Sequence, residues 1–229
     1  MARSSNISYK TSGYPTSDII RLTNMLTFRN LFALAIIGCA TMAVMSDAES
    51  QQLSKTAAPG ATAPKKGEEV AVLDTNMGKI IVKFYPDKAP NHVKNFKKLI
   101  KEKFYDGVKF HRVIPGFMIQ GGDPNTKGSD KSLYGTGGPG YTIKAEFNDV
   151  KHTPGILSMA RRSDPDSAGC QFFIMVNNYP SLDHQYTVFG IVIEGMDVVN
   201  KIVALPKDGR DCPLEPAIIK SAKLEKWGE

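Results

Sequence analysis

From residue 70 onward, apolar residues form short runs or alternate with polar ones. Short runs that are rich in β-branched and aromatic residues, and that end at Gly, Pro, Asn or Asp, are typical of strands. They predict eight strands, at residues 70–75, 80–84, 108–113, 117–120, 156–160, 171–176, 187–192 and 217–224. The first two are joined by residues 76–79 (Asn-Met-Gly-Lys), which supply the turn residues of a hairpin.

Apolar residues with the three- and four-residue spacing of a helix occur in two segments. After Pro90, apolar residues three or four positions apart are separated by lysines; they are Val93, Phe96, Leu99, Ile100 and Phe104. Residues 196–205 repeat the spacing. Many short strands with two helices predict a mainly β fold, a barrel or sandwich with the helices outside. The Gly-rich residues 121–140 are expected to be mostly loop.

The part of the chain before residue 69 has a different composition. Residues 30–46 are an uncharged, mostly apolar run, shorter than the ~20 residues of a spanning helix, so residues 1–48 are predicted to be a targeting segment. Residues 49–68, rich in Ala, Ser, Gln, Lys and Pro, are predicted to be a flexible linker. The folded domain is then residues 69–229.

The targeting segment has several possible fates. Residues 46–48 (Ser-Asp-Ala) offer small residues for signal cleavage, whereas residues 36–39 (Ile-Ile-Gly-Cys) resemble a lipoprotein box in which Cys39 would be lipidated. Retention as a membrane anchor is the third possibility. A start at Met25 would give the apolar run the short basic front end that signal peptides have. All three predict an exported protein, periplasmic or membrane-anchored.

Composition and charge exclude several classes of protein. Among the 229 residues, 41% are hydrophobic and 23% charged, which argues against a wholly disordered chain and a polytopic membrane protein. The net charge of +6 is spread thinly. The densest basic cluster consists of Lys94, Lys97, Lys98, Lys101 and Lys103. These lysines fit a solvated helix face, so no nucleic-acid partner is expected.

Cysteine, histidine and glycine give only weak signals of chemistry. The three cysteines and four histidines lack metal-ligand spacing, so no metal or cofactor is expected. Residues 135–140 (Gly-Thr-Gly-Gly-Pro-Gly) are followed by Tyr141 rather than the Lys of a phosphate loop, which indicates turn glycines. A thiol enzyme or redox protein built on Cys170 and Cys212 stays an alternative, and so does a disulfide between them.

One segment carries a specific resemblance. Residues 110–123 read Phe-His-Arg-Val-Ile-Pro-Gly-Phe-Met-Ile-Gln-Gly-Gly-Asp. With residues 155–160 (Gly-Ile-Leu-Ser-Met-Ala), 171–174 (Gln-Phe-Phe-Ile) and 186–190 (Tyr-Thr-Val-Phe-Gly), this string resembles the cyclophilin family of peptidyl-prolyl cis-trans isomerases. The resemblance covers residues 69–225. It implies an eight-stranded antiparallel closed barrel capped by two helices.

The resemblance also implies the site residues. Arg112, Gln120 and Phe117 match the catalytic positions. The substrate-binding positions are matched by Met118, Ala160, Arg161, Gln171, Phe173, Leu182 and Tyr186. Three positions depart from many eukaryotic members: Ser181 stands in place of Trp, Tyr186 in place of His and Arg161 in place of Asn. Tyr186 resembles bacterial members, and the departures bear on sequence preference and cyclosporin sensitivity.

The expected function is therefore rotation of X-Pro bonds in folding proteins. In this interpretation, Arg112 stabilises the twisted prolyl amide inside an apolar pocket, and Gln120 restrains Arg112 and anchors a peptide carbonyl. Proline-containing polypeptides are the expected partners of a monomeric enzyme. The alternative is a chaperone or scaffold that binds such peptides in the same pocket without turnover.

Overall fold

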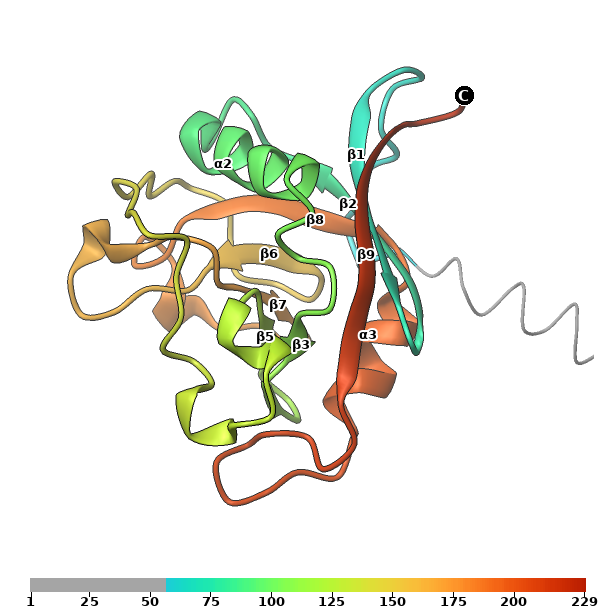
Figure 1. The fold of residues 1–229 in the computed structure, drawn as a ribbon. Helices are drawn as coiled ribbons and strands as arrows, with labels where there is room; N and C mark the ends of the chain where they lie inside the picture. Colours follow the sequence, from blue (N-terminus) through green and yellow to red (C-terminus); the bar gives the residue numbers. More distant parts are fainter. Residues whose placement is uncertain (1–56) are drawn as a thin grey trace, which may run out of the picture. The chain divides into compact units, whose positions relative to one another are not determined.

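The computed structural model describes residues 57–229. The predicted targeting segment, including Cys39, and residues 49–56 of the predicted linker lie outside the described residues. The described part contains one antiparallel sheet with two α-helices (Figure 1). The strands are β1 (Glu69–Thr75), β2 (Gly78–Phe84), β3 (Lys109–Phe110), β4 (Arg112–Ile114), β5 (Met118–Gly121), β6 (Ile156–Met159), β7 (Phe172–Met175), β8 (Val188–Glu194) and β9 (Ala217–Lys226). The α-helices are α2 (Pro90–Lys101) and α3 (Met196–Val203).

The sheet curls into a nearly closed barrel whose two edges meet at β3 and β4. The strand order is β3-β9-β1-β2-β8-β6-β7-β5-β4. His111 alone separates β3 from β4, and its N–H donates to the carbonyl of Gln120 on β5 at 3.0 Å. The predicted strand 108–113 is therefore two strands, because the chain changes partner from β9 to β5 at His111. This raises the count from eight to nine.

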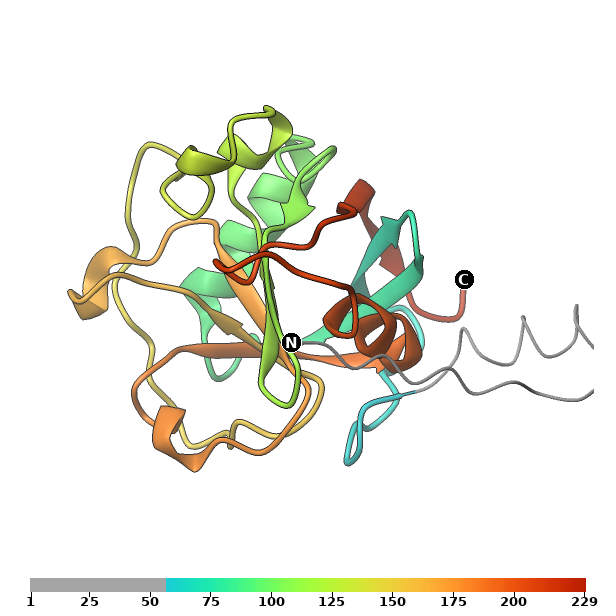
Figure 2. The same cartoon turned by 90° about the horizontal axis from the view of Figure 1, so that it is seen from below.

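The two helices lie on different sides of the barrel, α2 over β8 and α3 beside β2 (Figures 1 and 2). Pro90 begins α2, where its missing N–H costs no hydrogen bond. The helix buries the apolar stripe that the sequence predicted up to Ile100. It ends at Lys101, so Phe104 lies in the turn that follows, and α3 ends two residues earlier than predicted, at Val203.

Aromatic side chains fill the barrel beneath α2. Phe96 is fully buried, with its ring 4.8 Å from that of Tyr105, 5.3 Å from Phe172 and 5.2 Å from Phe189. Rings at these separations in edge or tilted arrangements add to the stabilisation from burial. Phe96 therefore links α2 to several strands at once.

Part of the predicted linker packs on the barrel. Ala58 is only 4% exposed, and its N–H donates to the carbonyl of Val192 on β8 at 3.1 Å. A Cβ added to Gly155 would lie 2.0 Å from the Cβ of Ala58, so the close approach needs glycine there. Gly67 donates its N–H to the Trp227 carbonyl at 2.8 Å. Sequence patterning missed these contacts because the segment has few large apolar residues.

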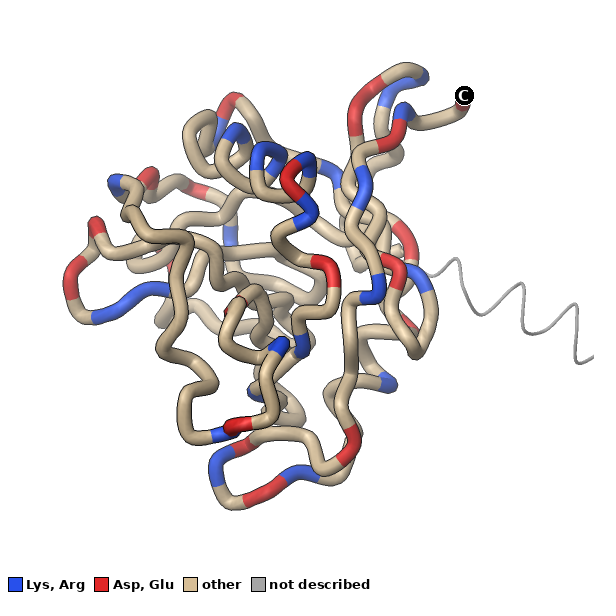
Figure 3. The backbone as a smooth tube through the Cα atoms, viewed as in Figure 1, with Lys and Arg blue, Asp and Glu red and all other residues tan. Residues whose placement is uncertain are grey.

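Charged residues of both signs are interspersed along the described chain and do not gather in one region (Figure 3). On α2, Lys97 pairs with Glu69 at 2.7 Å and Lys98 lies 3.9 Å from Glu102. These ion pairs fit a solvated helix face. No helix within residues 57–229 has both the length and the apolar character that crossing a membrane requires.

Candidate active site

Two adjacent pockets open between β5, β7 and the loops around them. The first has a volume of about 140 Å³. It is lined by Arg112, Phe117, Met118, Gln120, Ala160, Arg161, Phe173, Leu182 and Tyr186. All nine are residues that the sequence assigned to the site. Pockets for drug-sized ligands are typically ~300–1,000 Å³, so the first pocket has room for one small side chain.

The β4–β5 hairpin and β7 bring these residues together. Arg112 lies directly opposite Gln120 in the β4–β5 register, and Gln120 lies opposite Phe173 in the β5–β7 register. Because side chains alternate along a strand, Met118 and Gln120 share a face. The hairpin turns at Gly116, whose φ of 74° is a conformation that glycine adopts without strain.

The Arg112 guanidinium is held from two sides. Its Nη1 donates to Oε1 of Gln120 at 3.4 Å, and its Nε lies 3.9 Å from Oδ2 of Asp211. Lys207 contacts the other carboxylate oxygen of Asp211 at 2.6 Å. The Arg112 side chain is 42% exposed, and its Nη2 has no partner within residues 57–229. The guanidinium is therefore oriented and still has N–H donors for an external acceptor.

Apolar side chains form the floor and sides of the first pocket. Met118 is 1% exposed and Phe173 5%. The Phe173 ring stacks on His152, at 19° between planes, and meets Tyr186 edge-on at 5.6 Å. Phe117 packs on Tyr179, with ring centroids 4.4 Å apart. These contacts fix the rings that face the pocket, so the floor is preformed.

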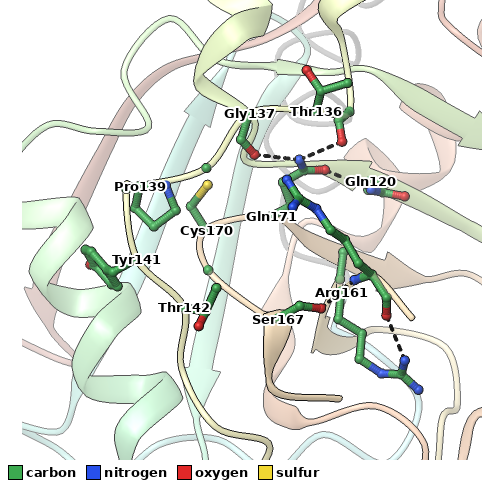
Figure 4. A pocket seen from close by; sticks show the side chains of 16 residues that line it. Gln120, Thr136, Gly137, Pro139, Tyr141, Thr142, Arg161, Ser167, Cys170 and Gln171 are labelled. Carbon is green, nitrogen blue, oxygen red and sulfur yellow. Dashed lines mark hydrogen bonds between the residues drawn. The ribbon is translucent and has the colours of Figure 1, made fainter. Parts of the chain in front are cut away.

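Gln171 lies outside the first pocket and acts on it through Gln120. Its Oε1 accepts a hydrogen bond from Nε2 of Gln120 at 3.1 Å. Its own Nε2 donates to the carbonyls of Gly135 and Gly137 at 3.1 and 2.9 Å (Figure 4). A hydrogen-bonded chain thus runs from Arg112 through both glutamines to the Gly-rich loop. The sequence placed Gln171 among the substrate-binding residues, and the structure makes it a wall of the neighbouring pocket.

The second pocket, of about 460 Å³, is the larger one (Figure 4). It shares Gln120, Ala160 and Arg161 with the first pocket. One wall is the loop 135–142 and the other is formed by residues 160–171. Gly169 lets the walls meet, because a Cβ there would lie 2.8 Å from Cδ of Pro139.

Arg161 uses its guanidinium to join two loops. Its Nε and Nη2 donate to the carbonyl of Gln185 at 3.1 and 3.0 Å, and its Nη1 donates to the carbonyls of Arg162 and Ser163. The guanidinium also lies 4.7 Å from the centre of the Tyr186 ring. Arg161 was predicted to bind substrate. In the structure its side chain holds the pocket wall in place.

The sequence missed several residues around these pockets. They are the loop residues 136–142, Arg162, Ser167, Tyr179 and Asp211. The Gly-rich string at 135–140 was the one sequence feature that could have indicated these residues. Its glycines do form turns, as predicted, but the turns also build the wall of the second pocket.

The two described cysteines are free and buried, so they do not form a disulfide with each other. Burial raises the pKa of the Cys170 thiol to about 12, and it also raises the pKa of Cys212. The thiolate is the nucleophilic form of cysteine, so neither thiol is activated. This environment argues against the alternative of a thiol enzyme.

We expect both thiols to react slowly in the native protein. In the full chain carrying Cys39→Ala, a chromogenic disulfide at pH 7.5 should modify Cys170 and Cys212 at least about 100-fold more slowly than in denaturant. Two thiols should be counted after unfolding. One thiol that reacts at the denatured rate in the folded protein would contradict the assignment and restore the thiol-enzyme alternative.

No group of three or more His, Cys, Asp or Glu within residues 57–229 is arranged to hold a metal ion. His111, next to Arg112, is 6% exposed, and neither of its ring nitrogens has a partner in the described chain. His152 and Asp183 form a pair, with Nδ1 and Oδ1 3.1 Å apart, behind Phe173. No His, Asp or Glu of the described residues lines either pocket, so these histidines and Asp183 are supporting groups.

The barrel thus combines a preformed apolar pocket the size of one small ring, an oriented cation beside it and a second, larger pocket next to it. The comparisons with known proteins identify which barrel this is. Residues 70–224 match the family described as cyclophilin type peptidyl-prolyl cis-trans isomerase/CLD. The chain belongs to the cyclophilin-type peptidyl-prolyl cis-trans isomerases.

Relatives from bacteria and yeast share this family. A probable peptidyl-prolyl cis-trans isomerase of Brucella abortus (strain 2308) is 46% identical over 140 residues, which are 59% of this chain and 71% of the relative. A peptidyl-prolyl cis-trans isomerase of Acinetobacter baylyi is 44% identical over 163 residues, 67% of this chain and 84% of the relative. The Schizosaccharomyces pombe isomerase ppi1 is 42% identical over 160 residues, 66% and 97% of the two chains.

Solved structures have the same fold. A Cryptosporidium parvum cyclophilin, crystallised in the presence of the dipeptide Ala-Pro, aligns with a TM-score of 0.63 at 32% identity. The alignment covers 69% of this chain and 99% of that one. The cyclophilin AquaCyp293 from Hirschia baltica aligns with a TM-score of 0.58 at 26% identity, covering 69% and 74%. The mainly β, antiparallel barrel with two helices that the sequence predicted is confirmed.

Proposed function

We propose that this isomerase accelerates rotation about X-Pro bonds by stabilising the twisted amide with Arg112, while the first pocket holds the proline ring. The observation that carries the proposal is the position of Arg112. Its guanidinium lies at the mouth of a pocket walled by Met118 and Phe173, and Gln120 orients it. A donor and a ring-sized apolar pocket are the two elements that this reaction requires.

The chemistry needs no bond to break. Amide resonance gives a rotational barrier of ~18–20 kcal/mol, so uncatalysed X-Pro exchange takes tens to hundreds of seconds. In the twisted state the nitrogen lone pair no longer delocalises and can accept a hydrogen bond. A group that binds this state more tightly than the planar one lowers the barrier. Arg112 suits the role because guanidinium stays charged and presents several fixed donors.

The apolar pocket strengthens this contact. Phe117, Met118 and Phe173 grip the ring and keep water from the amide. Excluding water strengthens the electrostatic contact with Arg112, and it removes hydrogen bonds that favour the planar form. The peptide backbone has partners as well, because the Ala160 carbonyl and the Arg161 N–H are unpaired within residues 57–229. The similarity to the Cryptosporidium parvum cyclophilin, crystallised with Ala-Pro present, supports proline-containing peptides as ligands.

Exchange spectroscopy on a proline peptide tests this function against simple binding. With the full chain at catalytic concentration, the cis and trans signals of an X-Pro peptide should broaden as their exchange rate rises. Binding without a change in the exchange rate would contradict catalysis and favour the chaperone or scaffold alternative. Unchanged spectra at all protein concentrations would contradict both.

We expect turnover to be nearly independent of pH from about 6 to 8, because no group proposed to act in catalysis titrates near neutrality. Burial lowers the pKa of His111 and His152, which favours the neutral form of both imidazoles. Initial rates on one X-Pro peptide across the range provide the measurement. A bell-shaped profile would contradict the proposal and indicate a titrating acid or base.

The lowered pKa values of the buried histidines also predict that the stability of the fold depends on pH. The unfolded histidines titrate near 6.5, above the lowered pKa values of His92, His111 and His152, so the unfolded chain binds more protons below that pH. The free energy of unfolding should therefore be level above about pH 7 and fall as the pH drops below about 6.5. Denaturant titrations from pH 5 to 8 measure it. A rise in stability on acidification would contradict the burial of neutral imidazoles.

Export and client choice extend the proposal. The apolar run at residues 30–46 and the lipoprotein-like box at Cys39 support export of the protein, and an exported isomerase would assist folding of envelope or secreted proteins. Cell fractionation with a mass measurement of the mature N-terminus tests this. A soluble cytosolic protein with an uncleaved, unmodified N-terminus would contradict export.

A further inference from the structure

The loop between α3 and β9 reaches the edge strand that carries Arg112 (Figure 2). Among the described strands, β4 lies at one end of the strand order and pairs with β5 alone. On its open side, the N–H of Val113 donates to the carbonyl of Asp211 at 2.8 Å. Asp211 is therefore tied by its backbone to the residue next to Arg112.

The turn that contains Asp211 is fixed by hydrogen bonds of its own. Oδ1 of Asp208 accepts from the backbone N–H groups of Arg210 and Cys212 at 2.9 and 3.0 Å. The N–H of Asp211 donates to the carbonyl of Asp208 at 3.0 Å, and the N–H of Asp208 donates to the carbonyl of Cys212 at 2.9 Å. These contacts give the Asp211 side chain a defined starting point.

Asp211 has a backbone conformation that residues other than glycine rarely adopt. Its φ is 64°, and only two other non-glycine residues within 57–229, Lys103 and His184, have a positive φ. Glycine would form the same turn with less strain, but it has no carboxylate. Strained residues of this kind cluster at functional sites. The conformation therefore points to a role for the Asp211 side chain.

The Asp211 carboxylate divides its two oxygens between two cations. Oδ1 accepts from Nζ of Lys207 at 2.6 Å, and Oδ2 lies 3.9 Å from Nε of Arg112. The contact to Arg112 is made through Nε, whereas Gln120 accepts from Nη1. The carboxylate therefore acts on the guanidinium without occupying its terminal nitrogens.

We infer that Asp211 is a positioning residue for the isomerase reaction, which holds the Arg112 guanidinium at the angle where its terminal N–H groups reach the twisted amide. The inference rests on the proposed function of Arg112. The single contact with Gln120, at 3.4 Å, leaves the guanidinium free to turn about one nitrogen, and the contact at Nε limits this motion. Asp211 lines neither pocket, so its loss should affect kcat more than peptide binding.

The test replaces the carboxylate by an amide of the same shape. Asparagine also tolerates a positive φ, so Asp211→Asn should keep the turn and the midpoint of unfolding. In the full chain, kcat for an X-Pro peptide should fall roughly three- to fivefold, the loss expected for one partly exposed ion pair. The Kd of the peptide should change by less than about twofold, because the apolar floor is untouched.

Asp149→Asn is the matched control. Asp149 contacts Nζ of Lys88 at 2.6 Å, which is also the distance of the contact between Asp211 and Lys207. It lines neither pocket. The control therefore loses the same charge and the same kind of ion pair, and it should keep the kcat of wild type.

Nuclear magnetic resonance of the Arg112 side chain provides a readout that a merely structural role would not move. The Nε–H signal should shift and show greater ps–ns mobility in Asp211→Asn, and it should stay unchanged in Asp149→Asn. An unchanged kcat, an unmoved Nε–H signal, or a fall in kcat that only follows a loss of folded protein would overturn the inference and leave the isomerase function intact. Wild-type turnover by Arg112→Ala would overturn the proposed mechanism as well.

Discussion

Arg112→Ala is expected to reduce kcat/KM for X-Pro isomerisation by about 100- to 1,000-fold without unfolding the protein. Removal of one preorganised donor that acts on a transition state typically costs this much. The side chain is 42% exposed and lies at the pocket mouth, so the core does not depend on it. The loss should appear mainly in kcat, because the donor acts on the twisted state, while peptide binding by the apolar floor should change little.

Arg112→Lys serves as the matched control. Lysine keeps the positive charge but loses the planar fork, so it cannot contact Gln120, Asp211 and a substrate together. Its rate should lie between those of wild type and Arg112→Ala. Thermal unfolding and peptide titration of all three proteins complete the measurement. Turnover by Arg112→Ala within twofold of wild type would contradict the proposed mechanism.

Phe96→Ala should give the largest loss of stability of any variant considered. Large-to-small changes of a buried Phe cost about 3–5 kcal/mol of unfolding free energy. The loss at Phe96 should lie at the upper end of this range, because its ring contacts four others. They are those of Phe84, Tyr105, Phe172 and Phe189. The resulting cavity would lie between α2 and the barrel.

Phe147→Ala provides the same chemical change at an exposed position, since Phe147 is 40% exposed. This substitution should lower the free energy of unfolding by less than about 1 kcal/mol. Denaturant titration of both variants measures the difference. At a temperature where Phe96→Ala remains folded, its turnover should stay within a few-fold of wild type, because Phe96 touches neither pocket. Similar losses of stability in both variants would contradict the role of Phe96 in joining the helix to the strands.

Local pattern was enough to predict much of the fold. The three- and four-residue spacing placed Phe96 on the buried face of α2, and the apolar runs located the strands. The break at His111 was missed, because a change of pairing partner depends on β5 and β9, which are distant in sequence. Periodicity describes which face of a segment is buried and gives no information on its neighbours.

The candidate site was likewise predicted only in part. The residues of the first pocket were implied by the family resemblance, and four of the nine lie in the string 110–123, where Arg112 and Gln120 face each other across one hairpin. The second pocket could not be predicted, because its walls belong to loops joined by contacts between residues far apart in sequence. Gln171 reaches the carbonyls of Gly135 and Gly137, which lie more than thirty residues away. Such side-chain contacts to loop backbones leave no periodic trace.

The chain of hydrogen bonds from Arg112 through Gln120 and Gln171 to the Gly-rich loop has a consequence for engineering. Redesign of the loop to accept other peptides would move the carbonyls that hold Gln171, and the displacement would pass to the guanidinium. Substrate range and turnover number are therefore coupled traits in this scaffold. Libraries that vary the loop should retain both glutamines and be screened for rate and selectivity in the same round.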